Sequence, residues 1–138
     1  MNSTDPSLSV AEGTFSVQMT PVAREGVDEG AVPMHVRLDK TFEGELSGIA
    51  SGELIGVPPG EIGSGAYVAI ERFEGVLAGR AGTFHMVHRG VMTRGGPDLL
   101  VTIVPDSGTG ELSGLSGRMH ILIEPGIHRY RLEYTIAP

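Results

Sequence analysis

Hydrophobic and polar residues alternate along much of this chain, and the most regular alternation runs from residue 67 to residue 90. A period of two is typical of β-strands, because successive side chains point to opposite faces. One face of each predicted strand carries Tyr67, Ala69, Glu71 and Phe73 in the first strand, and Phe84, Met86, His88 and Gly90 in the second. Glycines in the intervening segment, residues 75–82, allow the chain to reverse. We therefore expect a hairpin whose inward face includes the ionisable residues Glu71 and His88.

The same alternation predicts further strands on both sides of this hairpin. These segments are 14–20, 34–44, 98–104, 118–124 and 127–136, with a weaker strand, interrupted by glycines, over 45–55. No segment keeps the 3.6-residue period of an amphipathic helix. Roughly eight strands in hairpin order predict an all-β fold, a closed antiparallel eight-stranded β-barrel with little or no helix, because closure removes the exposed edges of an open sheet.

The chain of 138 residues is long enough to bury one hydrophobic core but short for two domains. We expect a disordered N-terminal segment over residues 1–12 and a single barrel domain over residues 13–138. A proline-bracketed acidic segment, residues 21–33, is expected to be a loop.

A short glycine motif, G-x-L-x-G, recurs along the chain. Its copies are Gly44–Gly48, Gly75–Gly79 and Gly110–Gly114. This spacing suits one pair of strands per repeat, which agrees with a barrel built from successive hairpins.

Charge and composition exclude several functions. The chain has 10 lysines and arginines against 17 aspartates and glutamates, a formal net charge of -7, so its field repels phosphate backbones and we expect no nucleic-acid partner. It has no cysteine, which excludes disulfides, a thiolate nucleophile and cysteine-ligated zinc. Its first residues lack the pattern of a signal peptide, and no apolar run is long enough to span a bilayer. We expect a cytoplasmic protein with no membrane partner.

Several short segments, taken together, resemble a known bacterial family. They are Lys40–Gly44, Ile70–Phe73, Gly79–Phe84, His88, Val104–Leu112 and His128–Tyr130. Together they are similar to the family called domain of unknown function 3224, over about residues 13–136. The resemblance implies a barrel like that of allene oxide cyclase, with an interior cavity and no settled activity. The wider barrel group includes plant cyclases and bacterial polyketide cyclases, but their catalytic residues match no motif of this chain.

The alternation also directs several chemically active side chains to the interior. We expect Glu71 or His88 to be the catalytic base, with a tyrosine or Lys40 as the donor to a developing oxyanion. The residues expected to bind a ligand are Lys40, Glu53, Tyr67, Phe73, Phe84, Met86, His128, Tyr130 and Tyr134. Glu53 belongs to this set only if the glycine-interrupted strand has the matching register.

Each of these residues also has a structural interpretation. Lys40 and Glu71 are expected to neutralise each other as a buried pair, and the histidines and tyrosines are most often packing residues. His85 and His88 are three residues apart, on opposite faces of a strand, so they cannot share a metal without a bulge. We predict no metal site and no cofactor.

Three functions remain open at this stage. The first is a cofactor-independent isomerase or cyclase that acts on a small hydrophobic substrate in the barrel. The second is a lipocalin-like binding or carrier protein, which needs a cavity but no general base. The third is a filled structural or oligomerising barrel. Barrels of this size often pair, so a homodimer is an expectation, although we identify no exposed apolar stripe that would form its interface.

Overall fold

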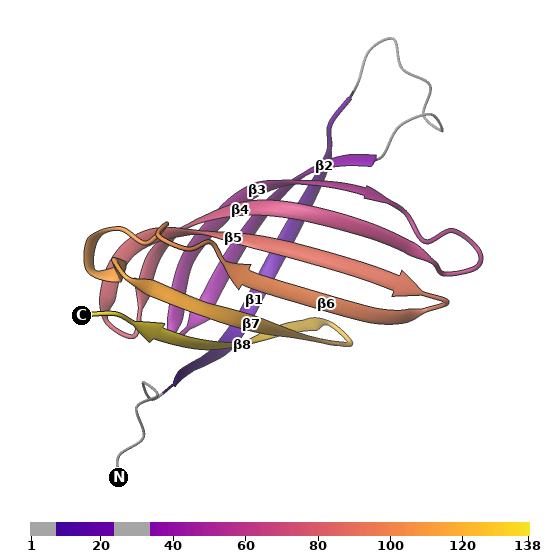
Figure 1. Ribbon diagram of the computed structural model, residues 1–138. Coiled ribbons are helices and arrows are strands. Elements are labelled where there is room, and N and C mark those ends of the chain that lie inside the picture. Colours follow the sequence, from indigo (N-terminus) through magenta and orange to yellow (C-terminus); the bar gives the residue numbers. More distant parts are fainter. Residues whose placement is uncertain (1–7, 24–33) are drawn as a thin grey trace.

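The computed structural model describes residues 8–23 and 34–138, which form a closed antiparallel barrel of eight strands (Figure 1). The strands are β1 (Ser9–Pro21), β2 (Met34–Gly44), β3 (Leu46–Val57), β4 (Gly65–Leu77), β5 (Arg80–Thr93), β6 (Gly96–Ile103), β7 (Leu115–Glu124) and β8 (Ile127–Ile136). Within the described residues, the only helical element is a single 3-10 turn, η1 (Gly110–Leu112). The predicted all-β eight-stranded barrel is confirmed.

Each strand pairs with the next along the chain, and β1 pairs with β8 to close the barrel. This pairing with β8 begins at Ser9, so the barrel starts four residues before the expected boundary at Gly13. Ala11 explains the earlier start, because its side chain is fully buried in the core. Residues 1–7 and 24–33, which include much of the predicted loop, lie outside the described residues.

The central hairpin has longer strands and a shorter turn than the sequence predicted. β4 continues to Leu77 and β5 begins at Arg80, so only Ala78 and Gly79 form the turn. Both residues have positive φ, 48° and 86°, as a two-residue hairpin turn of type I′ requires. Gly75 and Gly82, expected in the turn, instead face each other as a strand pair.

The three copies of the glycine motif meet at one end of the barrel, which we call the closed end. Their central leucines, Leu46, Leu77 and Leu112, each have 0% exposure and belong to one core cluster. At Gly82 an added Cβ would lie 2.1 Å from the backbone oxygen of Thr109, so glycine is needed where the chain around η1 crosses β5. The motif therefore closes this end with buried leucines.

The outer surface of the central strands is unexpectedly apolar. Side chains exposed there include Ile55 on β3, Val68 and Ile70 on β4, and Val87 on β5. Ile55 pairs with Val68, and Ile70 pairs with Val87, so the apolar positions are neighbours across the sheet. No apolar stripe of this kind was identified from the sequence, because it combines outward positions of three neighbouring strands, and such surfaces are common at interfaces. Separately, no helix among the described residues has the length and apolar character needed to cross a membrane.

Candidate functional site

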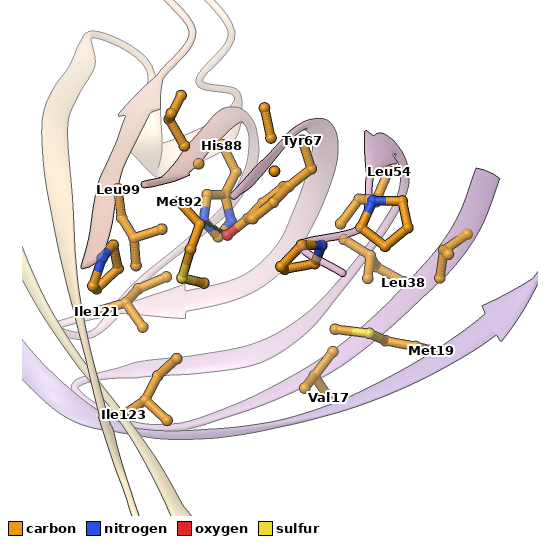
Figure 2. A pocket seen from close by; sticks show the side chains of 18 of the residues that line it. Val17, Met19, Leu38, Leu54, Tyr67, His88, Met92, Leu99, Ile121 and Ile123 are labelled. Carbon is orange, nitrogen blue, oxygen red and sulfur yellow. Dashed lines mark hydrogen bonds between the residues drawn. The ribbon is translucent and has the colours of Figure 1, made fainter. Parts of the chain in front are cut away.

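A pocket of about 320 Å³ lies at the end of the barrel opposite the buried leucines, which we call the open end. Its rim includes Pro58 and Pro59 after β3 and Met92 and Pro97 around the turn between β5 and β6. Figure 2 shows the apolar side chains that point into it, among them Val17, Met19, Leu38, Leu54, Leu99, Ile121 and Ile123. A concave, mainly apolar pocket with a few polar groups is the usual form of a small-molecule site.

Strands β6 and β7, which both contribute to the pocket wall, form few residue pairs with each other. These strands share only the pairs Val101–Met119 and Thr102–Arg118, whereas β4 and β5 pair from Gly65–Met92 to Leu77–Arg80. Towards the open end, side chains from both strands therefore form the wall in place of a continuous ladder.

A buried ion pair lies at the inner end of the pocket. Lys40 on β2 directs its Nζ at both carboxylate oxygens of Glu71 on β4, 2.9 Å from Oε1 and 3.1 Å from Oε2. The exposure of Lys40 is 7% and that of Glu71 is 1%. The same ammonium lies 5.2 Å from the centre of the Phe15 ring, within cation–π range. Lys40 lines the pocket, and Glu71 lies behind it, outside the pocket lining.

Tyr67 and His88 form the second polar group of the pocket. The Tyr67 hydroxyl and the His88 Nε2 are joined by a hydrogen bond of 2.8 Å, and the two rings are packed edge to face (Figure 2). On its other side, His88 Nδ1 lies 3.7 Å from Glu71 Oε2, which is too long for a hydrogen bond but close enough for electrostatic contact. The polar groups thus form a chain from Tyr67 through His88 and Glu71 to Lys40.

Burial and charge act in opposite directions on the Glu71 carboxyl. Burial alone raises its pKa, but His88 and the positive charge of Lys40 together outweigh burial and lower the pKa below its usual value. Oε1 has no aligned hydrogen bond among the described residues, although it lies at ion-pair distance from Lys40. The attraction at Oε1 is therefore mainly Coulombic. For Tyr67, burial and the negative charge of Glu71 raise the pKa, so the phenol keeps its proton at neutral pH.

The predicted site residues divide into three groups. Those that line the pocket are Lys40, Tyr67, His88 and His128, with Glu71 directly behind them. Those packed in the hydrophobic core, outside the pocket lining, are Phe73, Phe84, Met86, Tyr130 and Tyr134. Glu53 is on the outer surface, where it pairs with His35, so its predicted inward position is wrong.

Tyr130 illustrates the structural role of the core group. Its hydroxyl accepts a 2.9 Å hydrogen bond from the Leu46 backbone N–H and lies 2.9 Å from the Leu46 backbone oxygen. It also lies 3.1 Å from the backbone oxygen of Glu43. Tyr130 therefore ties β8 to the start of β3 near the closed end, and it lies outside the pocket lining.

Comparison with known proteins gives a family but no activity. The family described as "Protein of unknown function (DUF3224)" matches residues 11–134. The chain belongs to this family. A solved structure described as a protein with unknown function from the DUF3224 family of Shewanella oneidensis MR-1 has 41% sequence identity and a TM-score of 0.88, and the alignment covers 96% of this chain and 99% of that chain. No curated protein matches.

For this DUF3224 chain, sequence reasoning missed most of the apolar pocket wall. Val17, Leu38 and Leu54 fall within segments predicted as strands, but nothing in the alternation separates pocket positions from core positions. Gly90 was also missed, and here a signal exists. It ends the inward series of Phe84, Met86 and His88 on the pocket side, and a Cβ at this position would lie 2.4 Å from the Tyr67 ring. Glycine therefore leaves room for Tyr67 to lie across β5 and reach His88.

Metal binding receives no support from the geometry of the described part of the chain. Among residues 8–23 and 34–138, no three histidine, aspartate or glutamate side chains come together in a group that could hold a metal ion.

The lowered pKa of Glu71 predicts an acid dependence of stability. Because the folded-state pKa is below the unfolded value of about 4.3, this group adds stability above that pH and loses it as the pH falls through the folded-state pKa. We expect the difference in unfolding free energy between wild type and Glu71→Gln to be largest near pH 7 and to shrink below about pH 4. Urea unfolding at pH 7, 5, 4 and 3 measures it, with the exposed Glu74→Gln as control. A difference that grows on acidification would contradict the assignment.

Proposed function

We propose that this protein binds a small, mainly apolar molecule in the pocket at the open end of the barrel. The observation that carries the proposal is the pocket itself, about 320 Å³ in volume, with apolar walls and a small polar group at its inner end. That volume is at the lower end of the range for small-molecule sites. Burial of apolar surface supplies the affinity, and the polar group fixes the orientation of the ligand.

The polar groups favour binding over catalysis, because the candidate bases are already paired with other groups of the site. Glu71 is paired with Lys40 and lies outside the pocket lining, so it is poorly placed to take a proton from a bound molecule. His88 reaches the pocket, but its Nε2 is engaged by the Tyr67 hydroxyl. A set of paired groups of this kind can orient a ligand without any general base.

The test of binding uses Nile red, an uncharged apolar dye, and two tryptophan variants. Val17 lines the pocket, whereas Val68 is exposed on the outer surface of β4. We expect wild type and Val68→Trp to bind the dye with equal affinity, and Val17→Trp to weaken binding at least tenfold, because the indole fills the pocket. Fluorescence titration measures the affinities, and circular dichroism checks that both variants fold. Equal binding by all three proteins, or no binding by wild type, would reject the proposal.

A second candidate function is a cofactor-independent isomerase or cyclase. The observation that favours it is the continuous chain from Tyr67 through His88 to Glu71, in which a proton acceptor and a proton donor meet at the pocket. In this function His88 is the base and takes the substrate proton through the Tyr67 hydroxyl at its Nε2, while the nearby Glu71 carboxylate stabilises the protonated ring. Native mass spectrometry of the protein from its host would supply a retained compound for turnover assays. We expect His88→Ala to abolish conversion of that compound, and unchanged turnover would exclude this role.

A further inference from the structure

The charged groups at the inner end of the pocket cancel before any ligand enters. Lys40 is positive and Glu71 is negative, and their atoms are 2.9 and 3.1 Å apart. Both are buried, so solvent screens the pair only weakly. A ligand that reaches Lys40 therefore meets a cation whose charge is already neutralised by Glu71, which lies outside the pocket lining.

A carboxylate at this position would leave one negative charge without a partner. Two carboxylates would then share the single ammonium of Lys40 in a buried place, where an uncompensated charge is costly. Protonation of Glu71 could remove the excess charge, but its lowered pKa opposes this. The chain as a whole carries a net charge of -7, which further disfavours the approach of anions.

An uncharged oxygen avoids this cost and still finds hydrogen-bond partners. The Lys40 ammonium has three hydrogens, and among the described residues its hydrogen-bond and ion-pair contacts go to the two oxygens of Glu71 alone, which leaves a hydrogen for a ligand oxygen. The Tyr67 oxygen keeps a free lone pair for a ligand hydroxyl when its own proton is donated to His88.

We infer that the pocket selects molecules with an uncharged polar end, such as an alcohol, over carboxylates of the same size. This selectivity rests on the proposed binding function and adds the chemical class of the ligand. Glu71 acts as a specificity-determining residue that does not contact the ligand. It disfavours carboxylate ligands because its own carboxylate already neutralises the positive charge of Lys40.

The histidines that face the pocket are the other groups able to change its charge. His88 lies beside Glu71, and His128 lines the wall beside Phe15, with ring centres 5.2 Å apart. A protonated imidazole would offset the charge of a bound carboxylate. The test is therefore made at one fixed pH, pH 8, for both competitors.

The experiment compares 1-octanol with octanoate as competitors of bound Nile red. The two have the same chain length and differ in the charge of the polar end. We expect octanol to displace the dye from wild type at concentrations at least tenfold lower than octanoate. Equal potency, the reverse order, or no displacement by octanol would overturn the inference while leaving dye binding intact. Failure of wild type to bind Nile red would instead reject the binding function itself.

Variants that remove one or both charges test whether Glu71 is the residue that disfavours carboxylate ligands. In Glu71→Gln the charge of Lys40 is no longer balanced, so we expect octanoate to bind at least tenfold more tightly than it binds wild type. The double variant Lys40→Met/Glu71→Gln has neither charge and should again prefer octanol, which controls for the change of side chain at position 71. If octanoate affinity does not rise in Glu71→Gln, Glu71 is not the specificity determinant.

Discussion

Replacing Lys40 by methionine should lower the free energy of unfolding by about 3–5 kcal/mol, because the variant leaves the Glu71 carboxylate buried without its partner. Methionine keeps much of the length and apolar character of the lysine side chain, so the loss reports mainly on charge. The strong effect follows from burial, since Glu71 is 1% exposed and its carboxylate has few other partners. Urea unfolding at pH 7 measures the change.

Two comparisons separate this effect from a general loss of packing. Arg72→Met removes a pair with Glu74 of 3.3 Å in which both side chains are more than half exposed, and it should cost at most about 1 kcal/mol. The double variant Lys40→Met/Glu71→Gln removes both buried charges and should recover much of the stability lost in Lys40→Met. A change of less than about 1 kcal/mol in Lys40→Met would contradict the buried pair.

The interior of the barrel could be predicted from the period-two alternation, because that alternation assigns each residue to one of two faces. Lys40, Glu71 and His88 were assigned inward on this basis, and all three are buried. The proposed pairing of Lys40 with Glu71 also agrees with the structure, since an inward lysine and an inward carboxylate have few other ways to be neutralised.

Depth along the barrel could not be predicted in the same way. Alternation does not say whether an inward residue belongs to the closed half or to the pocket, because that depends on the stagger between strands. Tyr67 and Tyr130 illustrate the difference, since one lines the pocket and the other binds backbone groups near the closed end. Glu53 was misplaced because glycines at positions 48 and 52 blur the alternation of β3, and its neighbour Leu54 is the inward residue.

The glycine motif predicted regular hairpins. In the structure its three leucines are buried together in the core, which the motif alone did not predict. Three separated leucines converge only after the barrel closes, and no local pattern specifies that meeting. Leu112 belongs to η1 rather than to a strand, so its burial depends on the loop between β6 and β7 folding onto the closed end.

Leu112→Ala should therefore destabilise the barrel by about 2–5 kcal/mol, because it opens a cavity where η1 covers the closed end. Leu112 is fully buried, and its side chain packs over Gly82, where an added Cβ would lie 3.1 Å from Leu112 Cβ and Cγ. The matched control is Leu122→Ala on β7, a leucine that is 57% exposed, for which we expect a change within about 0.5 kcal/mol.

The same pair of variants tests whether the two ends of the barrel have separate roles. Leu112 does not line the pocket, so Leu112→Ala should leave Nile red affinity unchanged under conditions where the variant remains folded. Thermal unfolding and dye titration on the same samples provide both readouts. A stability loss equal to that of Leu122→Ala would show that η1 does not seal the core, and a parallel loss of dye affinity would show that the pocket extends through the barrel to the closed end.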